Sequence, residues 1–193
     1  SRYGVLALAE SLDHIGPMAR SVQDAGLMLQ AIAGFDPNDP TSLSDPVPNM
    51  LEGIENGIEG LRIGLDENYI SEGTDPQVTA SVLDGIKLLE SLGALIIPIK
   101  MPSTSDYMEA WGVLCASEAL VAHEETYPSR RNDYGPWFQG WLEKGAAVTG
   151  VEYAKANNIR SSCKGLLNKI FENIDVICCP TMTSPPVSYT HLR

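Results

Sequence analysis

Residues 60–99 read GLRIGLDENYISEGTDPQVTASVLDGIKLLESLGALIIPI, and the predicted fold follows from the pattern of these residues. The segment 61–65 alternates as a strand does, and the segment 94–99 is almost continuously apolar, as expected of a parallel strand covered on both faces. Between them, Asp75 and Pro76 form a helix start. Five apolar residues recur along one face of that helix: Val78, Val82, Ile86, Leu89 and Leu92. A strand, a helix and a strand with short links predict a right-handed crossover between parallel strands.

Other segments extend this unit in both directions along the chain. Ser21 is a good helix N-cap. We expect the helix after it to bury one stripe: Val22, Ala25, Leu29 and Ile32. A long helix is predicted from 105 to about 126, another begins at the capping box of Thr149 and Glu152, and 175–179 is predicted to be a third buried strand. The fold class is therefore α/β, with a mixed or parallel sheet covered by helices on both faces.

The amino-acid composition argues against several classes of function. The 193 residues have the length of one domain, and 44% hydrophobic residues are enough for a real core. The net charge of −12 argues against a nucleic-acid partner, because an acidic chain repels phosphate backbones. No apolar stretch has the ~18 residues of a membrane span. Four cysteines without C-x-x-C spacing favour reduced thiols and a cytoplasmic protein that does not bind membranes.

Most catalytic signatures are absent from the sequence. It contains no G-x-S-x-G, G-x-G-x-x-G, P-loop or H-E-x-x-H pattern. His14, His123 and His191 lie far apart, so we expect no metal site. Ser161 and Lys164 fit S-x-x-K, but they fall inside a predicted helix and lack the accompanying S-D-N and K-T-G motifs. We therefore interpret them as an exposed polar helix face. In an α/β sheet, ligands bind beyond the carboxyl ends of the strands, here near 66–69, 100–103 and 180–184.

Two charged residues occupy positions that suggest a structural role. Glu118 shares a helical face with Trp111, Leu114 and Cys115, and a carboxylate on an apolar stripe needs a partner unless it faces a pocket or the stripe's edge. Arg160 flanks the buried stripe of the helix that follows Thr149, where its stem can pack while its guanidinium pairs with a carboxylate. We predict that both residues are structural and that Glu118 is one candidate partner for Arg160.

A specific resemblance is carried by SLDHIGPMARSVQDAGLMLQAIAGFDPNDPTS at 11–42, which is similar to the amidase signature family just after its Gly/Ser-rich signature. SRYGV at 1–5 and GLRIGLDENY at 60–69 fit the same family in order, as do Tyr153 with Arg160 and the strand that ends in Pro180-Thr181. The resemblance covers roughly residues 1–186. It implies part of the amidase-signature fold, truncated, with 1–186 as an incomplete amidase domain and VSYTHLR at 187–193 as a non-native tail.

The resemblance also implies an activity, namely hydrolysis of carboxylic amides to an acid and ammonia or an amine. The family uses a Ser nucleophile, a bridging Ser in a cis peptide and a Lys, with backbone N–H groups for the oxyanion. It needs neither a metal nor an organic cofactor, and its partner is a small-molecule amide. In the family all three catalytic residues precede the point where this sequence starts, so we expect no catalytic residue in it and an inactive fragment of an active parent.

The branch of the family stays open. The A subunit of a tRNA-dependent amidotransferase carries an Arg for the glutamine carboxylate, whereas the matching segment here, GPWFQGWLEKG at 135–145, has none. Trp137, Phe138 and Trp141 suit an apolar acyl group or an aryl ring instead, although plain helix packing also explains them. Arg130 and Arg131 keep the amidotransferase alternative open. A third alternative is a non-catalytic α/β binding domain.

Overall fold

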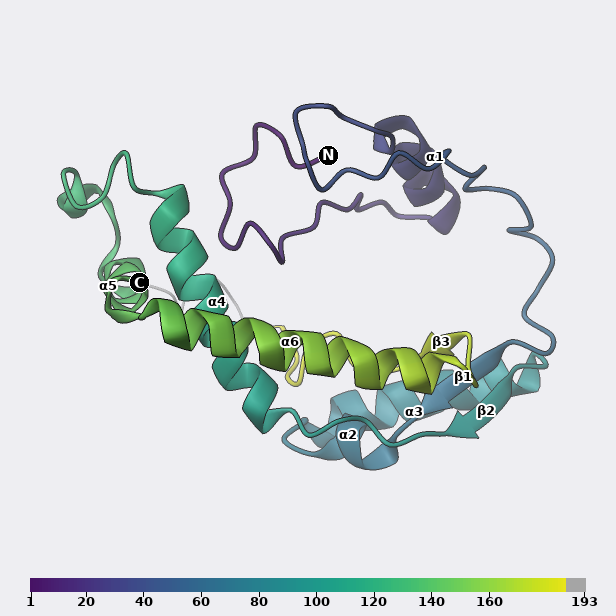
Figure 1. The fold of residues 1–193 in the computed structure, drawn as a ribbon. Coiled ribbons are helices and arrows are strands. Elements are labelled where there is room, and N and C mark those ends of the chain that lie inside the picture. The colour runs from purple at the N-terminus through teal and green to yellow at the C-terminus, as the bar shows by residue number, and fades with distance from the viewer. Residues whose placement is uncertain (187–193) are drawn as a thin grey trace. The chain divides into compact units, whose positions relative to one another are not determined.

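The computed structural model describes residues 1–186, so the prediction of a non-native tail at 187–193 lies outside the described residues. The chain forms two compact units (Figure 1). One contains Ser1–Glu55 with Thr104–Ser161 and is here called the helical unit. The other contains Asn56–Ser103 with the chain from Ser162 onward and is called the sheet unit. No helix in the described part is long and apolar enough to cross a membrane.

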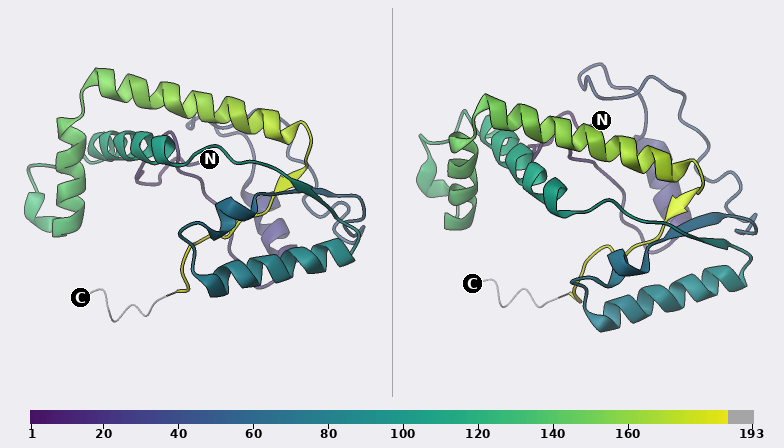
Figure 2. Two further views of the ribbon diagram at one scale, coloured as in Figure 1. Left: turned by 90° about the horizontal axis from the view of Figure 1, so that it is seen from below. Right: turned by 60° about the horizontal axis from the view of Figure 1, so that its bottom comes forward.

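The sheet unit is built on three parallel strands in the order β2-β1-β3. The central strand β1 (Arg62–Leu65) pairs with β2 (Leu95–Pro98) from Arg62 opposite Leu95 onward, and Ile63 pairs with Val176 of β3 (Val176–Ile177). Helix α3 (Pro76–Ser91) connects β1 to β2 and runs alongside them in both views of Figure 2. A helical connection between parallel strands and the α/β fold class are thus confirmed.

Local sequence explains the ends of the helices in this unit. The Asp75 carboxylate accepts a hydrogen bond from the Gln77 N–H at 2.7 Å, and Pro76 follows as the first helical residue of α3. Gly93 ends the turn after α3 with φ +97°, where a Cβ would also lie 3.2 Å from the Glu59 Cα, so only glycine fits there. The short helix α2 (Glu67–Ser71) is capped by Asp66. Buried Leu65, Ile70 and Ile86 form the core.

Burial corrects the expectation that all three strands are covered on both faces. β1 is buried from Ile63 to Leu65, but Leu95 of β2 is 52% exposed and Val176 of β3 is 40% exposed. β2 and β3 each have one neighbouring strand among the described residues, so they form the edges of the sheet. Continuous apolar sequence is therefore matched by continuous burial only in the central strand.

The helical unit contains α1 (Val22–Ile32), α4 (Ser105–Ala122), the 3-10 turn η1 (Arg131–Asp133), α5 (Pro136–Ala147) and the start of α6 (Gly150–Phe171). The predicted buried stripe on α1 is wrong, because α1 contains no buried residue and Val22 is 77% exposed. The capping box before α6 is confirmed, since the Thr149 N–H donates to Glu152 at 2.7 Å and the Glu152 N–H donates to the Thr149 hydroxyl at 3.2 Å.

Candidate functional site

Helix α5 carries the three aromatic residues that the sequence singles out. Gly135 precedes it and Pro136 occupies its first turn. At its other end, a Cβ on Gly145 would lie 2.1 Å from the Ala116 carbonyl oxygen, so glycine is what allows the backbones of α4 and α5 to approach closely. This close approach positions one face of α5 against α4.

The structure divides these three side chains between two aromatic groups. Trp137 stacks on Trp141 with ring centroids 6.0 Å apart, and Trp141 packs against Trp111 of α4 at 5.9 Å. Phe138 belongs to a different group, because it lies 6.1 Å from the Tyr134 ring and edge-on to His123. Trp137 is 78% exposed. The three residues therefore lie on one helix without converging on a single point.

The second group borders a cavity of about 490 Å³ within the helical unit. His123 Nδ1 lies 3.0 Å from the Tyr134 hydroxyl, which also contacts the Thr126 hydroxyl. All three residues line the cavity, and its lining also includes the ion pair of Arg130 with Asp133. The sequence analysis considers His123 only as a metal ligand, which it does not expect, and does not single out Tyr134. The signal it missed is an aromatic residue immediately before the Gly-Pro start of α5.

Glu118 is buried, 8% exposed, and its hydrogen bonds join three parts of the helical unit. It accepts from the Ser11 N–H and the Ser11 hydroxyl, each at 2.7 Å, and from the Tyr153 hydroxyl at 2.8 Å. Burial raises the pKa of Tyr153, and the hydrogen bond to Glu118 raises that pKa further. The carboxylate thus has hydrogen-bond partners and ties the N-terminal segment to α4 and α6.

Arg160 reaches this network through Ser11. Its guanidinium donates to the Ser11 hydroxyl at 2.6 Å and to the Asn157 side chain at 2.7 Å. Ser11 therefore lies between Arg160 and Glu118. The sequence analysis names Glu118 as a candidate direct partner of Arg160, whereas the structure connects the two through Ser11. This geometry agrees with a structural role for both charged residues, and that role stays a prediction.

The S-x-x-K pattern does not form a nucleophile–base pair in the structure. The Ser161 hydroxyl donates to the Asn157 backbone carbonyl at 2.9 Å, one turn back along α6. Such a bond within a helix uses the hydroxyl proton locally. Lys164 is exposed on the same helix. Among the residues that the structure describes, no three His, Cys, Asp or Glu side chains are grouped so that they could hold a metal ion.

The segments that follow the carboxyl ends of β1 and β2, where the sequence analysis predicts ligand binding, lie side by side. The Asp66 carboxylate caps α2 and also accepts a hydrogen bond from the Met101 N–H at 2.7 Å. That bond is the main cause of the lowered pKa of Asp66. Beyond β2, residues 100–103 line a groove together with the end of α6.

Comparison with known proteins places this geometry in a family. The family model described as Amidase matches residues 1–193. The chain is 36% identical over 182 residues to an amidase of Pseudomonas putida, covering 94% of this chain and 39% of that protein. It is 34% identical over 209 residues to the A subunit of the glutamyl-tRNA(Gln) amidotransferase of Pseudomonas fluorescens (strain Pf0-1), covering 96% and 43%.

A solved structure supports the same assignment. It comes from work on a vestigial protein complex and the evolutionary origins of an s-triazine catabolic enzyme, and it matches with a TM-score of 0.83 and 26% identity over 98% of this chain and 41% of that one. The chain thus spans about two fifths of the length of the relatives it matches. Because the family model matches the chain along its full length, the chain belongs to the amidase signature family.

Proposed function

We propose that this chain is part of an amidase that hydrolyses carboxylic amides to an acid and ammonia or an amine. The observation that carries the proposal is the 36% identity to the Pseudomonas putida amidase over 94% of the chain. Because the chain spans 39% of that relative, the activity is assigned to a longer protein that includes these residues.

The proposed chemistry uses a Ser nucleophile, a bridging Ser in a cis peptide and a Lys. The nucleophile attacks the amide carbon while its proton passes through the bridging Ser to the Lys. The C–N bond then breaks, the amine leaves with a proton, and water hydrolyses the acyl-enzyme. Two observations support placing this triad outside the 193 residues: the sequence has no Gly/Ser-rich signature loop, and the Ser161 hydroxyl is bonded to its own helix. No metal or organic cofactor is part of the proposal, and we propose a cytoplasmic location.

We also propose that the aromatic residues of α5, namely Trp137, Phe138 and Trp141, contact the acyl or aryl part of the substrate. Trp137, which is 78% exposed, offers an accessible ring supported by stacking on Trp141. In the longer protein, Trp137→Ala should raise KM for an aryl amide such as acetanilide more than for propionamide. Phe35→Ala is the matched control, because Phe35 is 61% exposed on another part of the helical unit. An equal effect of both substitutions would contradict the assignment.

The second candidate is the glutamine-hydrolysing A subunit of a tRNA-dependent amidotransferase, favoured by 34% identity over 96% of the chain. That function needs a cation for the glutamine carboxylate. Both nearby arginines already have partners, since Arg130 pairs with Asp133 at 2.6 Å and Arg131 pairs with Glu143. Their engagement supports the amidase proposal over this alternative. Preference for glutamine over acetanilide and propionamide in the longer protein would reverse this order.

The chain by itself should be inactive on all three amides. The reason is the missing covalent machinery, without which acyl transfer loses its nucleophile and proton relay. The measurement is release of amine or ammonia by the purified 193-residue chain, with Ser161→Ala as the control variant. Hydrolysis by the chain that disappears in Ser161→Ala would contradict the prediction and would give the S-x-x-K pattern a catalytic role.

A further inference from the structure

A groove of about 790 Å³ lies between the segment that leaves β2 and the end of α6, and its lining belongs entirely to the sheet unit. One wall is made by residues 97–103 and the other by Leu166, Lys169 and Ile170, continued by Glu172 and Asn173. Its volume falls within the range of about 300–1,000 Å³ that small-molecule sites occupy.

The first wall of the groove is mainly apolar, and Leu166 and Ile170 form the apolar part of the second wall. Ile97, Ile99 and Met101 are half-buried on the first wall, and Ile170 is half-buried on the second. Ile99 also packs over Gly64 of β1, where a Cβ would lie 3.0 Å from the Ile99 Cδ1. Pro98 and Pro102 have no N–H group, so the first wall offers few backbone donors to a polar ligand. The walls therefore suit a hydrocarbon body.

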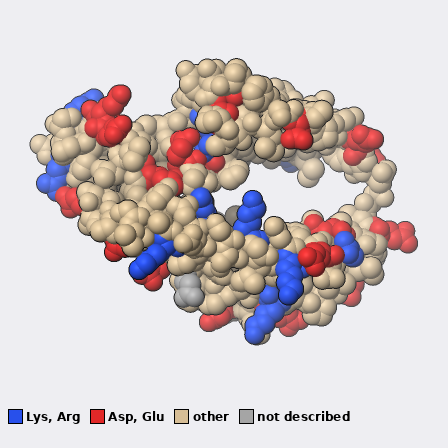
Figure 3. Space-filling model, viewed as in Figure 1, with Lys and Arg blue, Asp and Glu red and all other residues tan. Residues whose placement is uncertain are grey.

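The charged residues that line the groove carry a net positive charge, opposite in sign to the net charge of the whole chain. Two lysines and one glutamate give the lining a net charge of +1, whereas the whole chain carries −12. The lysines lie on opposite walls. Lys100 interacts electrostatically with Asp66, whereas Lys169 makes no hydrogen bond or ion pair with the residues that the structure describes. Figure 3 shows basic side chains among acidic ones on the visible face of this unit.

We infer that this groove binds a small amphipathic monocarboxylate, with the hydrocarbon body between the two walls and the carboxylate beside Lys169. A hydrogen bond between an ammonium and a carboxylate is charge-assisted, and burial of the ligand's CH₂ groups between the walls adds to the affinity. The same lysines disfavour an amine of equal length. The inference does not depend on the proposed amidase activity.

The test is calorimetric titration of the 193-residue chain with octanoate, octan-1-ol and octylamine, which share one hydrocarbon chain and differ in the head group. Octanoate should bind about 10-fold more tightly than octan-1-ol, as a charge-assisted hydrogen bond predicts. Octylamine should bind more weakly than either, and added salt should weaken octanoate binding alone. No amide bond is involved, so the result is separate from the test of hydrolysis.

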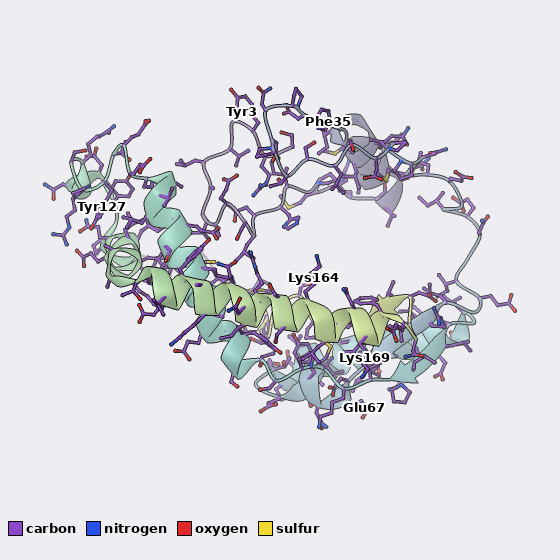
Figure 4. All side chains as sticks on the ribbon, viewed as in Figure 1. Tyr3, Phe35, Glu67, Tyr127, Lys164 and Lys169 are labelled. Atoms are coloured by element: carbon purple, nitrogen blue, oxygen red, sulfur yellow. The ribbon has the colours of Figure 1, made fainter. Side chains whose placement is uncertain are left out.

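Lys169→Gln should lower the affinity for octanoate to that for octan-1-ol without affecting octan-1-ol binding. Lys164→Gln is the matched control, because Lys164 lies on the same helix (Figure 4) and is not part of the lining. Both lysines are exposed, so neither substitution should impair folding. Absence of saturable octanoate binding, equal affinity for octanoate and octan-1-ol, or equal effects of the two substitutions would overturn the inference.

Discussion

Glu118 accepts three hydrogen bonds from two residues that lie 107 and 35 positions away in the sequence. Its carboxylate is therefore the point at which the N-terminal segment, α4 and α6 meet. Loss of one acceptor here leaves a buried donor without a partner, which costs more than the bond itself contributes.

Glu118→Gln should lower the free energy of unfolding by about 1–3 kcal/mol, because one amide NH₂ then faces the N–H or hydroxyl donors of Ser11 and Tyr153. Chemical denaturation of both proteins measures the difference. Glu109→Gln, on an exposed position of α4, is the control and should change the unfolding free energy little. Equal effects of the two substitutions would show that the network adds no stability.

Asp175 gives a prediction for pH. Arg62 donates to its carboxylate from Nε at 3.2 Å, from a terminal nitrogen at 2.7 Å and from the backbone N–H at 2.8 Å. The side-chain hydrogen bond from Arg62 is the main cause that lowers the pKa of Asp175 to about 2. The unfolded-state value is ~3.9. Because the folded pKa is depressed, the stabilisation is fully present above pH ~4 and is lost as pH falls toward ~2.

The measurement is the Tm of the chain and of Asp175→Asn as a function of pH. The chain should have the higher Tm at neutral pH, and the difference should shrink between pH ~4 and ~2. High salt should reduce it throughout, since both side chains are about two-fifths exposed. A difference that stays constant over this pH range would contradict the link to the Asp175 carboxylate.

At the scale of elements, small residues decide how closely α4 and α5 pack. Ala116 and Ala119 are fully buried, and Gly145 faces the Ala116 carbonyl. The sequence gives only a weak indication of this close packing, because alanines and glycines in helices form no strong periodic pattern. The close approach became visible only once both helices were placed together.

Gly145→Ala should destabilise the chain by about 3 kcal/mol or more, because its Cβ would lie 2.1 Å from a backbone oxygen that cannot move independently of α4. Gly140→Ala on the same helix is the control, since nothing lies within 4 Å of its Cβ. This control should be stabilising by about 0.5–1 kcal/mol through helix propensity. Thermal unfolding of the two variants checks the pair, and a mild effect of Gly145→Ala would mean that α4 and α5 are farther apart.

At the scale of the whole molecule, each unit has its own core. Leu65, Ile70 and Ile86 are the buried cluster of the sheet unit, whereas Ala119, Tyr127 and Leu142 belong to the helical unit. Separate cores favour local unfolding of one unit while the other stays protected.

Gly64→Val tests this independence. A Cβ at position 64 would lie 2.5 Å from the Ile174 Cδ1, so the substitution should disrupt the sheet unit. Hydrogen exchange should then lose protection in β1, β2 and β3 while α4 and α5 keep theirs. Simultaneous loss of protection in both units would show that the chain unfolds as one cooperative body.

Elements with strong local signals could be predicted from the amino-acid sequence. The crossover of 60–99 and the capping box at Thr149 were both predictable, because caps and periodicity act within a few residues. The family could be inferred from the block at 11–42. The burial of each strand and the partners of Glu118 could not be predicted in this way, since both depend on residues far apart in the sequence. The tertiary structure also showed that the ring of Phe138 stacks on Tyr134 whereas Trp137 and Trp141 stack on each other, although Phe138 and Trp141 pack against the same buried cluster.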